Sequence, residues 1–150
     1  QALHFSELAC DQLQRIGNPE WLAQGFIRLA GLNRQANDAN LALSLLFNAL
    51  DIYRTLDRPQ AFAQLNLEIG KTYLKLGDLA AARTYLIAAR NSYKRQQDAQ
   101  GELATLVTLS ELYLRHKEPE MAISLLENLP AAIDKGPPDD LERHYLLAQA

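Results

Sequence analysis

Apolar and small residues recur along this chain at a spacing of forty positions. The stretch from Tyr73 to Ala89 reads YLKLGDLAAARTYLIAA, and forty positions later the chain reads YLRHKEPEMAISLLENL. The apolar positions match while almost none of the polar residues are kept, which indicates repeated packing and hence a repeated structural unit. The same step links Ala42, Ala82 and Ala122; Ala9, Ala49 and Ala89; Leu46, Leu86 and Leu126; and Leu29, Ile69 and Leu109.

Each unit is predicted to contain two amphipathic helices. Residues 59–76 and 79–94 both carry apolar groups three and four positions apart, which is the spacing of one face of an α-helix. Gly77 falls at the expected end of the first helix, where a left-handed residue is common, and Asp78 is placed to cap the second helix. The two residues therefore indicate a helix–turn–helix joint.

The neighbouring units place other residues at this joint. Asn37 and Asp38 occupy it in one unit, and Lys117 and Glu118 occupy it in the other. Lys tolerates the left-handed conformation less well than Asn does, so we predict that the third joint is the least ideal. Pro119 nevertheless suits the first turn of the helix that follows.

We assign residues 1–150 to one domain that is built of forty-residue units. A stack of repeats needs polar caps where stacking stops, so we expect the natural protein to continue past Ala150 and before Gln1. Our assignment gives residues 1–17 to the second helix of a partial repeat, residues 18–57, 58–97 and 98–138 to three repeats, and residues 139–150 to the start of a further repeat.

Pro130 lies where the other units have helix interior. Because proline interrupts the helical hydrogen bonds, the last helix is predicted to stop or kink near Asn128. The stretch that follows, DKGPPDD at residues 134–140, is rich in turn-forming residues and is predicted to be the most open connection.

The composition favours an all-α fold and limits the partners. The chain has 48% hydrophobic and 22% charged residues, an ordinary balance for a globular domain. Leu and Ala dominate, Val107 is the one valine, and residues that favour helices far outnumber those that favour strands. The net charge of -3 gives no basic field for a phosphate backbone, so we expect no nucleic-acid partner.

Two further features bear on the compartment. Cys10 is the one cysteine, so the chain cannot form an internal disulfide, which favours a cytoplasmic location. The apolar runs fall well short of the roughly 18 residues that a membrane span needs. We therefore expect this segment not to cross a membrane.

No constellation of catalytic or metal-binding residues is evident. His4, His116 and His144 lie on different predicted helices without the spacing of a metal site, and solvated or partly packed histidines are the simpler interpretation. The chain contains neither a Gly-rich phosphate loop nor a nucleophile elbow. Asp139 and Asp140 most simply cap a helix. We therefore expect no enzyme activity, no cofactor and no metal.

The repeated residues resemble those of the tetratricopeptide repeat family, in a longer variant with units of about 40 residues. The signature of the first helix of the repeat, helix A, is matched by Asn66, Ile69, Gly70 and Tyr73, and that of the second helix, helix B, by Ala82, Leu86 and Ala89. The first unit departs from the pattern, with Asn33 in place of the tyrosine. This resemblance implies an all-α fold, a right-handed α-solenoid of antiparallel helix pairs with about seven or eight helices.

The resemblance also implies where a partner would bind. In tetratricopeptide repeat proteins the helix A faces line a concave groove that takes a segment of a partner protein. The family's chaperone-tail clamp is not assigned, because Ile27 and Leu67 stand where cations or amides would be expected. The matching groove positions are Gln24, Ile27, Arg28 and Gly31 in the first unit, Gln64, Leu67, Glu68, Lys71 and Lys75 in the second, and Ala104, Val107, Thr108, Glu111 and Arg115 in the third.

Two interpretations of the charged groove residues stay open. Arg28 lies one unit from Glu68, and Lys71 lies one unit from Glu111, so these charges could pair along the groove and stabilise stacking by about 0.5 kcal/mol each. Alternatively they contact a partner.

The apolar groove residues also leave two alternatives. Ile27, Leu67 and Val107 form a stripe that a partner helix could cover with its own apolar face. Neighbouring helices of further repeats could cover it instead.

Two classes of function follow. The first is a protein–protein interaction module, a scaffold whose groove holds a peptide or helix of a partner, and whose open solenoid ends would allow homo-oligomers. The second is the sensory or regulatory region of a larger bacterial signalling protein, in which groove occupancy controls an output domain. Long-unit repeats of this type resemble those of transcription regulators, sensor kinases and cyclic-nucleotide-making enzymes of the diguanylate-cyclase type.

Overall fold

The computed structural model describes residues 8, 11–12, 15 and 17–127, and it is all helical over this part of the chain. All-α structure is therefore confirmed. The six helices are fewer than the seven or eight expected, because the additional helices were assigned to flanks that lie largely outside the described residues. The helices are α2 (Pro19–Gln35), α3 (Ala39–Thr55), α4 (Ala61–Leu76), α5 (Leu79–Gln96), α6 (Ala99–Arg115) and α7 (Pro119–Glu127).

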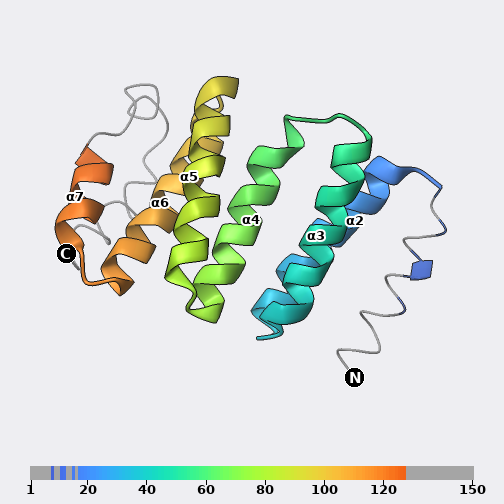
Figure 1. Ribbon diagram of the computed structural model, residues 1–150, viewed down its shortest axis with the longest axis horizontal. Coiled ribbons are helices and arrows are strands. Elements are labelled where there is room, and N and C mark those ends of the chain that lie inside the picture. The colour runs from blue at the N-terminus through green and yellow to red at the C-terminus, as the bar shows by residue number, and fades with distance from the viewer. Residues whose placement is uncertain (1–7, 9–10, 13–14, 16, 128–150) are drawn as a thin grey trace.

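The helices stack side by side in chain order as antiparallel pairs (Figure 1). α2 packs most extensively on α3, and α4 on α5, while α3 and α5 also contact the first helix of the next pair. The first helices α2, α4 and α6 contact one another in series, whereas no Cα atom of α3 lies within 8 Å of one in α5. The layer made of α2, α4 and α6 is therefore the inner, concave side of the stack.

Small residues occur where the two helices of a pair cross. Ala42 and Ala82 are fully buried, and Ala122 is nearly so. A Cβ added to Gly70 of α4 would lie 2.7 Å from the side chain of Leu86 in α5, so only glycine allows this close approach. These contacts explain why small residues recur with the period of the repeat.

Two apolar clusters form the core. The first joins α2, α3 and α4, and it includes the buried side chains of Leu46, Tyr53 and Ile69. The second joins α4, α5, α6 and α7, and it includes Leu86 and Leu109. α4 contributes to both clusters, so each unit is sealed only by stacking on its neighbours.

The predicted turn chemistry is confirmed. Gly77 has the left-handed φ of 82°, and the Asp78 side chain accepts a hydrogen bond from the Ala81 backbone N–H at 3.0 Å. Asn37 and Lys117 adopt φ values of 65° and 61° at the corresponding positions. The left-handed conformation disfavours residues with a Cβ, and Lys tolerates it less well than Asn or Gly. The third joint is therefore the least favourable of the three.

The predictions for Asn128, Pro130 and residues 134–140 lie outside the described residues. Division of the chain into repeats with bounds at 18, 58 and 98 stays a prediction. The pairs α2–α3, α4–α5 and α6–α7 begin within a few residues of those bounds.

Candidate partner-binding site on the concave face

The inner helices form a pocket near their C-terminal ends. Its volume is about 290 Å³, and three successive inner helices contribute to it. The pocket includes five of the groove residues that the sequence predicted. Its lining consists of Arg34 and Gln35 from α2, Lys71, Leu74 and Lys75 from α4, and Thr108, Glu111 and Arg115 from α6.

The predicted apolar stripe is not an exposed surface. Ile27 is 6% exposed and Leu67 is 5% exposed, and each belongs to a core cluster, while Val107 is half-buried. The expectation that a partner helix covers this stripe is therefore wrong for Ile27 and Leu67. The reason is that α2, α4 and α6 touch one another directly, so these side chains fill the spaces between the inner helices.

The remaining predicted groove residues lie outside the pocket lining. Gln24 is half-buried, and its side-chain amide donates a hydrogen bond to the Tyr53 hydroxyl at 2.7 Å, which joins α2 to α3. Arg28 and Gln64 are exposed on α2 and α4. Gly31 and Ala104 also lie outside the lining.

Glu68 is the centre of an ion-pair cluster beside the pocket. Its carboxylate lies 2.8 Å from Arg34 Nη1 and 2.9 Å from Lys71 Nζ. Arg34 also donates to the Glu68 backbone carbonyl and to the Thr72 hydroxyl, both at 3.3 Å. This cluster ties α2 to α4 across two repeats.

The two cations determine the ionisation of Glu68. Burial alone would raise the pKa of its carboxyl group, but the charges of Lys71 and Arg34 and their hydrogen bonds together lower this pKa below the usual value. Glu68 is therefore ionised throughout the physiological pH range, and one carboxylate is shared by two cations.

The predicted ion pairs between equivalent positions, Arg28 with Glu68 and Lys71 with Glu111, do not form. Arg34, and not Arg28, pairs with Glu68 across the repeats. Positions related by the repeat are one interhelical spacing apart, about 8–10 Å, so equivalence alone does not bring their charged ends together. Lys71 pairs with Glu68 inside α4 instead of with Glu111.

Arg115 and Glu111 pair with each other inside α6. Arg115 Nη2 lies 2.6 Å from Glu111 Oε1, and Nη1 donates to the Leu74 carbonyl of α4 at 3.0 Å. Lys75, by contrast, is exposed and forms no ion pair or side-chain hydrogen bond within the described part of the chain. The pocket therefore carries an excess of positive charge.

The sequence prediction missed Arg34, Gln35 and Leu74. A signal was available for Gln35, because it lies forty positions before Lys75 and eighty before Arg115, both of which were predicted. Arg34 could have been found as the basic residue in the last turn of α2, but that position more often only complements the helix dipole.

The described residues offer neither a cluster of metal-ligating side chains nor a membrane-spanning helix. No group of three or more His, Cys, Asp or Glu residues there could hold a metal ion. His116 Nδ1 lies 2.9 Å from Glu118 Oε1 in the exposed joint before α7, so this histidine makes a turn contact. No described helix is both long and apolar enough to span a bilayer.

Antiparallel helix pairs stacked with small residues at every crossing define an α-solenoid built of helical repeats. Residues 61–128, from the start of α4 through α7, match the family model of the tetratricopeptide repeat, so this segment is similar to tetratricopeptide repeats. No curated protein matches the chain. The family supports a protein–protein interaction module in general, and it is generally non-catalytic.

Proposed function

We propose that this protein is a non-catalytic interaction module that holds a segment of a partner protein against the concave face of α2, α4 and α6. The observation that carries the proposal is the pocket to which three successive inner helices contribute. A segment lying across these helices would contact several repeats at once, which is how a solenoid makes an extended binding surface.

The size of the pocket favours a protein segment over a small molecule. Small-molecule sites usually measure about 300–1,000 Å³ and are mostly apolar. This pocket is at the lower limit of that range, and most of its lining side chains are charged or polar. It has room for a few side chains of a segment whose remaining contacts extend along the groove toward Gln64 and Arg28.

Two groups of residues on the concave face have different roles in this proposal. Ile27, Leu67 and Gln24 are engaged in packing, so they shape the groove without touching the partner. Lys75, Gln35 and the cations around Glu68 are accessible and line the pocket. The contacts inside the pocket are therefore assigned to the C-terminal halves of the inner helices, and the rest of the segment lies along the groove toward Gln64.

The sensory alternative would use the same groove. In that case occupancy of the pocket would bias an output domain elsewhere in a longer protein. A binding experiment on this chain tests the step that both functions share.

Site-specific photo-crosslinking tests the proposal. A crosslinking amino acid is placed at Gln35 or at Gln64 on the inner helices, and at Asn91 on the outer helix α5 as a control; all three positions are exposed. We expect the same partner to be captured from Gln35 and Gln64 but not from Asn91. Capture from Asn91 alone would move the site to the outer face and refute the groove.

A further inference from the structure

The excess positive charge of the pocket is divided between two places. At the first, Arg34 and Lys71 share the single carboxylate of Glu68, which leaves one positive charge in excess. At the second, Lys75 has no ionic partner within the described residues. Each place therefore has the capacity for one further negative charge.

The third cation site of the pocket is already neutralised. Arg115 is bound by Glu111 at 2.6 Å and is also held by the Leu74 carbonyl. Among the residues that line the pocket, Glu111 is the one with negative charge. The Glu111 carboxylate pairs with the Arg115 guanidinium, which could otherwise bind a ligand.

The lysines of the two places, Lys71 and Lys75, are attached to α4 one helical turn apart. Lys71 and Lys75 are separated by four residues on α4, so their Cβ atoms lie about 5–6 Å apart on one face of the helix. In an extended peptide, side chains two positions apart point to the same side and are separated by about 6–7 Å. The spacing of the Lys71 and Lys75 Cβ atoms therefore matches that of alternate side chains in an extended segment.

We propose that the pocket binds an acidic partner segment in which two carboxylate side chains stand two positions apart, one on Lys75 and one on the Arg34–Lys71 pair. This inference rests on the proposed function and names the chemistry of the partner. Two separate single charges suit two carboxylates better than one dianionic phosphate, which would need its cations gathered at one point.

The charge of the whole chain makes this pocket stand out. The net charge is -3, so attraction of an acidic segment arises from the pocket and not from the protein as a whole. Interactions between exposed charges are screened beyond about 8–10 Å at physiological ionic strength. We therefore expect the affinity to fall steeply as salt is added.

Fluorescence polarisation with short labelled peptides tests the proposal. The probe is an N-acetylated, C-amidated serine-rich peptide containing Glu-Ser-Glu, compared with the Gln-Ser-Gln peptide and with the isomer that contains Ser-Glu-Glu. We expect binding about tenfold tighter than the Gln-Ser-Gln peptide and about threefold tighter than the isomer. The isomer has the same charge, so equal binding would overturn the proposed spacing.

Two further peptides separate other sources of negative charge. One has a free C-terminal carboxylate and no glutamate, and the other has a single phosphoserine. Binding of either peptide more tightly than the Glu-Ser-Glu probe would overturn the assignment to paired side-chain carboxylates.

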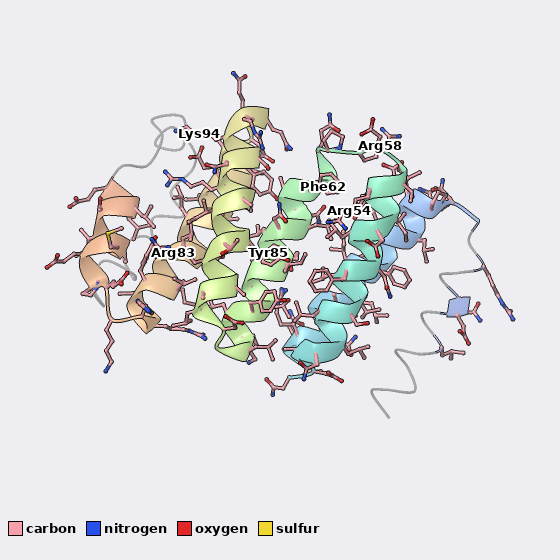
Figure 2. The ribbon with its side chains drawn as sticks, in the orientation of Figure 1. Arg54, Arg58, Phe62, Arg83, Tyr85 and Lys94 are labelled. Carbon is pink, nitrogen blue, oxygen red and sulfur yellow. The ribbon has the colours of Figure 1, made fainter. Side chains whose placement is uncertain are left out.

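Variants of the pocket complete the test. Lys75→Gln should weaken binding of the Glu-Ser-Glu probe about tenfold. Lys94→Gln on α5, a residue labelled in Figure 2 that does not line the pocket, should not change it. Glu111→Gln should strengthen binding about threefold, because it releases the Arg115 guanidinium. Weaker binding by Glu111→Gln, in a variant whose circular dichroism is unchanged, would contradict the proposal.

The outcomes also separate this inference from the proposed function. Groove crosslinks together with no preference for acidic peptides would refute the acidic segment and leave the interaction module intact. Absence of crosslinks from Gln35 and Gln64 to any partner that the chain binds would refute the groove itself.

Discussion

The two seams between repeats use the same helix arrangement but different side chains. We call the contact of α4 with α2 and α3 the first seam, and the contact of α6 with α4 and α5 the second seam. Leu50 and Phe62 are half-buried at the first seam, and Phe62 lies between α3 and α4 in Figure 2. The residues forty positions later at the second seam are Arg90 and Glu102.

The second seam therefore contains a buried charge where the first has an aromatic ring. Glu102 is 6% exposed, and its Oε1 lies 3.7 Å from Arg90 Nε. That oxygen has no hydrogen-bond partner within the described part of the chain. Burying a carboxylate with one loosely placed cation costs more than burying an apolar ring, so the second seam is sealed by a less favourable contact at this point.

Tyrosines at the two seams face neighbours of different size. Tyr53 is paired by position with Ala61, and Tyr93 with Gly101. A Cβ at position 101 would overlap the Tyr93 ring, with Cγ only 2.7 Å away. Burial of this ring, followed by the charges of Asp98 and Glu68, raises the pKa of Tyr93 to about 12.

On the concave side it is the first seam that carries the charged pair. The first seam is bridged by the Arg34–Glu68 ion pair, whereas the corresponding positions at the second seam are Leu74 and Thr108. Arg115 bridges the second seam instead, through the Leu74 carbonyl. The two seams therefore bring equivalent helices together, while their polar contacts are arranged independently at each one.

Gly101→Ala should have the largest effect, because it makes the second seam resemble the first while Tyr93 still fills the space. We expect a loss of about 3 kcal/mol of unfolding free energy, measured by urea denaturation, and a lower pKa of Tyr93 measured by absorbance. Gly31→Ala is the matched control, since nothing lies within 4 Å of an added Cβ there. A gain of about 0.5–1 kcal/mol is expected for the control.

Arg90→Leu should have the next largest effect. It removes the nearest cation from a buried carboxylate and is expected to cost about 2 kcal/mol. The double variant Arg90→Leu with Glu102→Phe copies the apolar pair of the first seam and should recover most of that loss. If the double variant is as unstable as the single one, the two seams do not share the same packing space.

Glu68→Gln tests the ion pair that bridges the first seam. Because the pKa of Glu68 is lowered in the folded protein, its stabilising contribution is present above the pKa of the unfolded chain and is lost as the pH falls through the folded value. We expect Glu68→Gln to cost about 1–2 kcal/mol at pH 7. The difference from wild type should shrink in acid below about pH 4. A difference that stays constant with pH would show that the carboxylate charge is not the cause.

Lys117→Gly should have the smallest effect and gives a reference outside both seams. Lys117 has a φ of 61°, and glycine removes the penalty of the left-handed conformation, so a gain of about 1 kcal/mol is expected. Gly77→Lys at the equivalent joint should lose a similar amount. Thermal unfolding measures the change in stability of each variant. Changes of the same sign in the two variants would contradict this explanation.

Helices and turns could be predicted because they depend on near neighbours. Apolar spacing of three and four residues predicted the helices now seen as α4 and α5, and the Gly77–Asp78 joint follows from local backbone chemistry. Lys71, Lys75, Thr108, Glu111 and Arg115 were predicted as groove residues from their repeat positions, and they line the pocket.

The errors concern contacts between elements. Ile27 was expected on an exposed stripe but lies in the core, and Arg28 was expected to pair with Glu68 although Arg34 does so. Both outcomes depend on how closely the inner helices approach and on the reach of long side chains. A repeat period states which positions are equivalent, but it does not state the distance between them.

The sequence by itself determined the period, the helix pairs and the small residues at their crossings, because each follows from local propensity or from the close approach of the two helices of a pair. Only the tertiary structure decided which charges neutralise one another, which apolar groups are covered, and where unpaired positive charge gathers. Those properties depend on separations of a few ångströms between residues distant in the chain, and the same forty-residue pattern is compatible with more than one such arrangement.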